Sequence, residues 1–95
     1  GEKTVDAVYN DDWQTKYYIR LTVKDQPGVL GAIAGYFGKY KVSIASVIQK
    51  GYGNTTAPLI FVTHEASEKS IQKAISEIRE SSCVVSVDNI IRVEE

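Results

Sequence analysis

The sequence predicts an α+β domain whose strands and helices follow the order β-α-β-β-α-β. Two observations support this prediction: four stretches have the alternating or continuous apolar pattern of strands, and two others repeat apolar residues every three to four positions, as amphipathic helices do. The 95 residues suit a single domain. A hydrophobic fraction of 43% and a formal net charge of −1 are typical of a globular protein rather than a disordered one.

The first predicted strand covers residues 17–23. Four apolar side chains share one of its faces: Tyr17, Ile19, Leu21 and Val23. A turn at residues 25–28, which contains Pro and Gly, ends this strand. The first helix is predicted over about residues 28–40, because apolar residues recur there at helical spacing. These are Leu30, Ile33, Ala34 and Phe37.

The second half of the chain repeats the pattern. Strands are predicted over residues 43–50 and over 58–64, and the second of these is nearly all apolar, as a buried central strand would be. A second helix is predicted after Ser67, which is expected to be its N-cap. Its apolar stripe consists of Ile71, Ala74, Ile75 and Ile78. The last strand is predicted over residues 84–93, with a bulge or break at Asp88-Asn89 and a shared face for Val85, Val87, Ile91 and Val93.

Two βαβ halves with right-handed crossovers give a ferredoxin-like sandwich. We expect a four-stranded antiparallel sheet of strand order 2-3-1-4 with both helices on one face. This order places 43–50 and 84–93 at the edges and leaves the other sheet face uncovered. A domain this small commonly completes its burial with a partner, so a dimer through the 43–50 edge is expected.

Residues 1–16 are interpreted as a linker or N-terminal extension that precedes a domain at 17–95, because they show no sustained periodicity. The alternative is a connector whose aromatic side chains, including Trp13, pack on another domain. Met is absent even at position 1, which we interpret as the mark of a processed product or a piece of a longer protein.

Composition and motifs argue against several classes of protein. The charge near zero argues against nucleic-acid or anionic-membrane binding, and no apolar run approaches the ~18 residues of a membrane span. The single cysteine, Cys83, excludes an internal disulfide and fits a reducing cytoplasmic setting. His64 has no recognisable nucleophile, and no phosphate-binding or metal-binding motif occurs, so no catalytic residue is predicted. An RNA-binding module shares the element order, but residues 58–64 lack its aromatic and basic pattern.

The turn at residues 25–30 is the most informative segment. Pro27 suits the start of a helix, and Gly28 has no Cβ and therefore leaves the backbone open to a ligand. The free N–H groups of the first helical turn would bind a carboxylate, and Asp25 beside them would bind an ammonium group, so an α-amino acid is indicated. The alternative is that Asp25 or Gln26 simply caps the helix. A larger residue at position 28 is expected to block binding at little cost to the fold.

The sequence of this turn and of later segments resembles that of a known family. Residues 25–30 (DQPGVL), followed by residues 42–50 (VSIASVIQK), resemble the ACT domain, an amino-acid-sensing module of metabolic enzymes. Residues 63–68 (THEASE) and 91–94 (IRVE) are similar to one subset, the C-terminal regulatory domain of bacterial homoserine dehydrogenase. The resemblance covers about residues 17–95. Gln26 departs from it, since an Arg is frequent at that position.

The resemblance implies a regulatory rather than catalytic chain that dimerises side by side and binds an amino-acid effector at the interface. One wall of the implied site lies in the turn of one copy: Asp25, Gln26, Gly28, Val29 and Leu30. The other wall lies on the edge strand of the second copy: Ser46, Ile48 and Gln49. The implied effector is L-threonine, and no cofactor is expected here, since NAD(P) would bind a catalytic portion elsewhere. Two alternatives are an ACT domain of another enzyme and a dimerisation module without a ligand.

Overall fold

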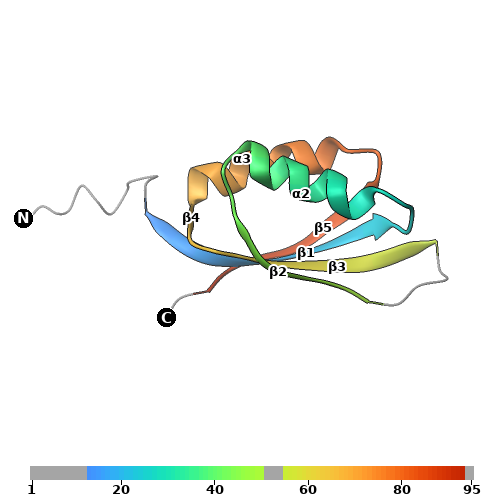
Figure 1. Ribbon diagram of the computed structural model, residues 1–95, viewed down its shortest axis with the longest axis horizontal. Coiled ribbons are helices and arrows are strands. Elements are labelled where there is room, and N and C mark those ends of the chain that lie inside the picture. Colours follow the sequence, from blue (N-terminus) through green and yellow to red (C-terminus); the bar gives the residue numbers. More distant parts are fainter. Residues whose placement is uncertain (1–12, 51–54, 94–95) are drawn as a thin grey trace, which may run out of the picture.

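The computed structural model describes residues 13–50 and 55–93 and confirms the predicted fold. The elements are β1 (Gln14–Lys24), α2 (Val29–Lys39), β2 (Ile44–Gln49), β3 (Thr56–Thr63), β4 (Ala66–Ser67), α3 (Glu68–Glu80) and β5 (Val84–Val93). The long strands form an antiparallel sheet of order β2-β3-β1-β5, which is the predicted order 2-3-1-4. Both helices cover one face of this sheet, and the other face is bare (Figure 1).

The core lies between the sheet and the helices. The predicted inward face of β1 is confirmed, since Tyr17, Ile19, Leu21 and Val23 are all buried. Phe37 of α2 packs on Phe61 of β3 with ring centroids 5.1 Å apart. The one buried polar residue of the described chain is Thr63, whose hydroxyl accepts a hydrogen bond from the Tyr17 N–H at 3.1 Å. The buried polar group is therefore satisfied.

Helix α2 buries a different stripe from the predicted one. Its buried residues are Val29, Ile33 and Phe37, whereas Leu30 remains 39% exposed and Ala34 is half-buried. Val29, Ile33 and Phe37 follow an i, i+4, i+8 spacing and so share one face of the helix. Leu30 is thereby left at the surface beside the turn.

The C-terminus of α2 is closed by a Schellman motif. Lys41 adopts a left-handed conformation with φ of 63°. Its N–H donates to the Gly38 carbonyl at 2.9 Å, and the Val42 N–H donates to the Phe37 carbonyl, also at 2.9 Å. Val42 and Phe37 are both buried, and an apolar contact between residues at these two positions often accompanies the motif.

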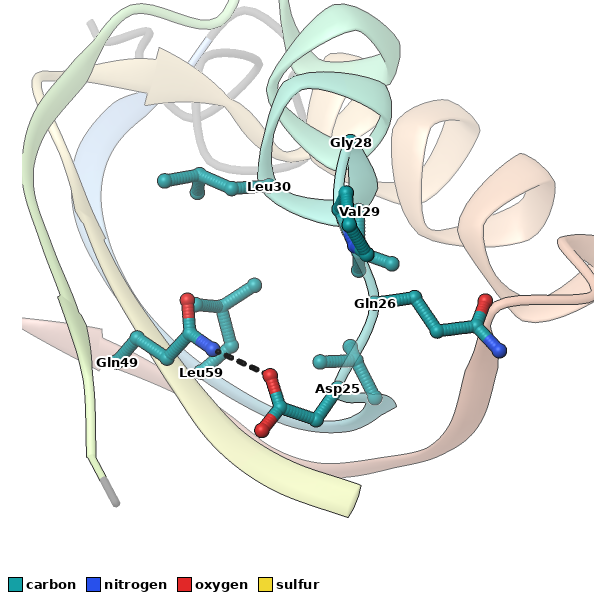
Figure 2. Close-up of a pocket in the computed structure, with 9 residues that line it drawn as sticks. Asp25, Gln26, Gly28, Val29, Leu30, Gln49 and Leu59 are labelled. Carbon is teal, nitrogen blue, oxygen red and sulfur yellow. Dashed lines mark hydrogen bonds between the residues drawn. The ribbon is translucent and has the colours of Figure 1, made fainter. Parts of the chain in front are cut away.

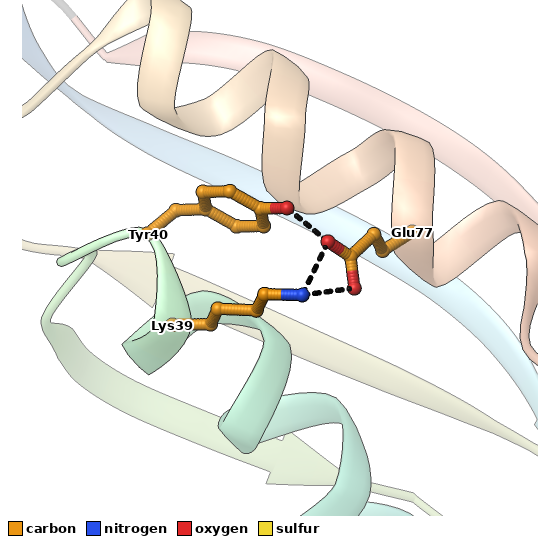
Figure 3. A network of polar contacts seen from close by, with 3 residues as sticks. All are labelled: Lys39, Tyr40 and Glu77. Carbon is orange, nitrogen blue, oxygen red and sulfur yellow. Dashed lines mark hydrogen bonds and ion pairs between the residues drawn. The ribbon is translucent and has the colours of Figure 1, made fainter.

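Helix α3 matches its prediction closely. Ser67 is the N-cap, and its hydroxyl accepts from the Ser70 N–H at 3.1 Å. The predicted stripe of Ile71, Ala74, Ile75 and Ile78 is buried. The two helices are joined by a polar cluster in which Glu77 of α3 accepts from the Lys39 ammonium, at 2.9 Å, and from the Tyr40 hydroxyl (Figure 3). The hydrogen bond from Tyr40, followed by that from Lys39, lowers the pKa of Glu77.

The predicted shared face of Val85, Val87, Ile91 and Val93 is wrong. The pairing of β5 with β1 shifts register twice: Arg20 faces Asn89 while Leu21 faces Val87, and Thr22 faces Ser86 while Val23 faces Val84. Each shift leaves one extra residue in β5, and each bulge reverses the alternation. The residues packed against the core are consequently Val84, Val87 and Ile90. The irregularity expected at Asp88-Asn89 is confirmed, and the second, at Val85, was not predicted.

The ends of the predicted elements also differ from the structure. β1 begins at Gln14, inside the segment interpreted as a linker, because Gln14 and Thr15 pair with the unpredicted short strand β4. Trp13 before it is 58% exposed, and residues 1–12 lie outside the described residues. β3 ends at Thr63, so His64 follows the strand as an exposed residue.

The uncovered face of the sheet is partly apolar. Strand pairing places Tyr18 between Val62 and Ile91, and Ile48 opposite Ile60, all on the face away from the helices. Ile48 and Ile91 are 49% and 50% exposed. Apolar side chains of this kind on an open face fit a domain that packs against another one.

Candidate functional site

The turn between β1 and α2 forms the floor and one wall of a pocket of about 370 Å³. Its lining residues come from the end of β1, the turn, the start of α2, β2 and β3: Val23, Asp25, Gln26, Pro27, Gly28, Val29, Leu30, Gln49 and Leu59. Backbone hydrogen bonds hold the turn on both sides. The Lys24 N–H donates to the Cys83 carbonyl at 2.9 Å, and the Asp25 N–H donates to the Thr55 carbonyl at 3.0 Å.

Gly28 is the N-cap of α2, with φ of 86° and ψ of −10°. A Cβ built at Gly28 meets no atom within 4 Å, so the backbone is open here, as expected from the sequence. The positive φ nevertheless strains any L side chain, so we now expect substitution at Gly28 to destabilise the fold as well as to affect binding. Pro27 precedes the N-cap instead of opening the helix.

The first turn of α2, beside the pocket, has unpaired N–H groups. The first full helical hydrogen bond runs from the Ala32 N–H to the Gly28 carbonyl at 3.0 Å. Within the described chain, the N–H groups of Leu30 and Gly31 have no backbone acceptor, and no side chain caps the helix. The alternative in which Asp25 or Gln26 caps α2 is therefore wrong. The helix dipole adds partial positive charge at this point, so a carboxylate is the complementary ligand group.

Asp25 and Gln49 meet across the pocket (Figure 2). The Gln49 Nε2 donates to the Asp25 Oδ1 at 3.4 Å, which joins the last residue of β2 to the turn. Asp25 is half-buried, and it is the only charged side chain among the nine described residues that line the pocket. The site therefore combines a donor-rich helix start with one carboxylate.

The structure brings six of the eight sequence-predicted site residues to this pocket: Asp25, Gln26, Gly28, Val29, Leu30 and Gln49. Leu30 extends from α2 toward β2, whereas Gln26 points away from the Asp25–Gln49 pair (Figure 2). Gln49 was expected to face the turn of a second copy, but it lies beside Asp25 of its own chain.

Ser46 and Ile48 do not reach this pocket. They pair with Val62 and Ile60, on the sheet face away from the helices, whereas Gln49 pairs with the buried Leu59. Alternation along β2 therefore separates Ile48 from Gln49. Two apolar lining residues, Val23 and Leu59, were not predicted as site residues, although the inward alternation of β1 already placed Val23 next to the turn.

No helix in the described parts of the chain is both long and apolar enough to cross a membrane. Across residues 13–50 and 55–93, no group of three or more His, Cys, Asp or Glu side chains is arranged to hold a metal ion.

The fold and the pocket together define a small ferredoxin-like module with a pocket at the start of its first helix. The chain belongs to the ACT domain family, whose model matches residues 17–82.

Two relatives that are similar to this chain in sequence are homoserine dehydrogenases. The enzyme of Neisseria gonorrhoeae is 41% identical over 85 residues, which cover 88% of this chain and 20% of that protein. The enzyme of Mycobacterium tuberculosis H37Rv is 35% identical over 86 residues, which cover 85% of this chain and 20% of that protein. The chain thus spans about a fifth of the length of these relatives.

Two solved structures have the same fold as this chain. A homoserine dehydrogenase from Thiobacillus denitrificans superposes with a TM-score of 0.80 at 30% identity, over 90% of this chain and 19% of that one. The ACT domain of a GTP pyrophosphokinase from Chlorobium tepidum superposes with a TM-score of 0.61 at 15% identity, over 85% of this chain and the whole of that one, and so supports the fold alone.

Proposed function

We propose that this chain is the regulatory ACT domain of a homoserine dehydrogenase and that it binds L-threonine as a feedback effector. The observation that carries the proposal is the pocket at the start of α2. It is lined by Asp25 and by Gly28 and Leu30, whose N–H groups have no acceptor in the described chain. An α-amino acid carries the two complementary charges. The similarity to homoserine dehydrogenases supports the choice of parent enzyme.

In the proposed binding mode, the effector carboxylate accepts hydrogen bonds from the N–H groups of Gly28 and Leu30, which line the pocket, and the ammonium group pairs with Asp25. The side-chain hydroxyl reaches the Gln49 amide, and the methyl group contacts Leu30 and Leu59. The pocket of about 370 Å³ is large enough for a small amino acid together with some water.

We also propose a side-by-side homodimer through β2. This edge strand carries no charged side chain between Ile44 and Gln49, so its free backbone groups can pair with a second strand. The opposite edge, β5, is interrupted by two bulges, which hinder such pairing. The pocket adjoins β2 through Gln49, so a second copy at this edge would lie next to the ligand.

The parent enzyme would transfer hydride between NAD(P)H and aspartate semialdehyde in a catalytic portion outside these residues. A cytoplasmic location goes with this proposal, since the lone Cys83 suits a reducing compartment.

Titration of the chain with amino acids tests the proposal. L-Threonine is expected to bind in calorimetry and to shift the NMR signals of residues 25–31 and 44–49 together. D-Threonine is the stereochemical control, because it has the same groups in the wrong arrangement. The matched variant Asp25→Asn keeps the shape and removes the charge, and it should weaken binding about tenfold or more, as loss of a hydrogen bond to a charged group does. If none of the twenty amino acids binds, the chain is a dimerisation module without a ligand.

A further inference from the structure

The sheet face that the helices leave bare has an apolar patch across its middle strands (Figure 1). Tyr18 of β1 is half-buried and lies between Val62 of β3 and Ile91 of β5. Ile60 and Ile48 continue the patch towards the β2 edge. Ile48 and Ile91 are 49% and 50% exposed. A sheet normally buries an apolar face against a second layer, so this face lacks the layer that would cover it within the described chain.

The charges beside this patch have both signs. Arg20 is exposed, and Asp88 accepts hydrogen bonds from the hydroxyl groups of Ser86 and Thr22 at 2.7 Å each. These two bonds, followed by the positive charge of Arg20, lower the pKa of Asp88, so its carboxylate is ionised at neutral pH. A face that carries a cation and an anion can pair with a copy of itself, because a two-fold axis lets each charge approach the opposite one.

The size of the face determines how many copies are needed to cover it. Four strands about 4.8 Å apart, with roughly eight residues of about 3.3 Å each, give a face of roughly 500 Å². A stable interface buries about 800 Å² on each partner, so the face of one copy is too small. Two copies joined along β2 present about 1,000 Å² as one continuous sheet, which is sufficient. Lys16 and Lys24 lie towards the ends of β1 and therefore at the rim of such a contact.

We propose that the bare face is a second self-association surface, through which two β2-paired dimers pack their sheets together into a tetramer with the helices outside. This inference rests on the side-by-side dimer proposed above, and it identifies the occupant of the face as a second β2-paired dimer. The two sheets lie about 10 Å apart, as in a β-sandwich. The two contacts are coupled, because loss of the β2 pairing halves the continuous face and removes the tetramer as well.

Sedimentation velocity of the chain from micromolar to millimolar concentration tests the inference, and dimers and tetramers are expected. Ile91→Lys places an ammonium group in the patch, on the strand farthest from β2. It should raise the dimer–tetramer Kd by about tenfold or more and leave the dimer intact, because an unpaired charge is costly to bury. Ser76→Lys is the matched control, since it adds the same charge at an exposed position of α3 and should change neither equilibrium. Val47→Lys should weaken both.

Val62→Thr is a second variant that keeps the fold if Ile91→Lys does not. It preserves the β-branched shape of a half-buried residue, replaces one methyl group by a hydroxyl group, and should also weaken the tetramer. Circular dichroism would check that each variant is folded.

Three outcomes would contradict the inference. If the chain stays dimeric at every concentration and Val47→Lys is monomeric, the inference is overturned, the β2 dimer stands, and a different protein covers the face. If a tetramer forms and neither Ile91→Lys nor Val62→Thr weakens it, the tetramer uses another surface. If the chain is only monomeric, the proposed β2 dimer fails together with the inference, whereas amino-acid binding is still decided by the titration described above.

Discussion

The same change, glycine to alanine, is expected to have opposite effects at two positions of the first helical segment. Gly28 has φ of 86°, whereas Gly35 lies within α2, and a Cβ built at either meets no atom within 4 Å. Space is therefore equal at the two sites, and the backbone conformation differs. The comparison isolates the contribution of backbone strain to the turn that shapes the pocket.

The magnitudes follow from these conformations. At Gly28, alanine in the left-handed region costs about 1–2 kcal/mol. The smaller entropy of the unfolded chain returns about 0.4–1 kcal/mol, so the net destabilisation is about 1 kcal/mol. At Gly35, alanine improves helix propensity and stabilises by about 0.8–1 kcal/mol. The two variants should thus differ by about 2 kcal/mol, or on the order of ten degrees in Tm for a domain of this size.

Thermal and urea unfolding, followed by circular dichroism without ligand, would measure both variants. Several protein concentrations should be used, because self-association also changes Tm. If Gly28→Ala is as stable as the unmodified chain or more so, strain at position 28 is not what selects glycine there. If Gly35→Ala instead lowers the Tm, and the Tm of this variant changes with protein concentration differently from that of the unmodified chain, the exposed face of α2 takes part in the dimer.

Three further outcomes are expected. Val47→Lys should weaken the dimer in sedimentation experiments, because it places like charges where two β2 edges meet, whereas Val85→Lys on the opposite edge should not. Lys41→Gly should raise Tm by several degrees, since it relieves about 1 kcal/mol of left-handed strain. Glu77→Gln should lower Tm at neutral pH. The bond from Tyr40 lowers the pKa of Glu77 below its ordinary value of 4.5. The ionised Glu77 therefore stabilises the fold above about pH 4.5, and this stabilisation is lost as the pH falls through the folded-state pKa, so the Tm difference between variant and parent should shrink there.

Short-range patterns in the sequence predict much of the domain correctly. The alternation of β1, the stripe of α3 and the Ser67 cap all depend on neighbours within a few residues, so they can be predicted without knowledge of the fold. The same holds for the turn at residues 25–28, because proline and glycine act on their own backbone. The candidate site was first located from this turn, and the family resemblance added the residues of the edge strand.

The tertiary structure decided which way the edge strands point their side chains. Two bulges in β5 moved Val87 and Ile90 toward the core and left Val85 and Ile91 exposed, and these bulges exist because of how β5 pairs with β1. The pairing of β2 with β3 placed Gln49 in the pocket and Ile48 on the far face. A one-residue shift in register reverses the face of every later side chain, and register is set by a strand distant in sequence. For this reason the sequence located the turn that lines the pocket, and only the fold determined that Asp25 and Gln49 of the same chain meet there.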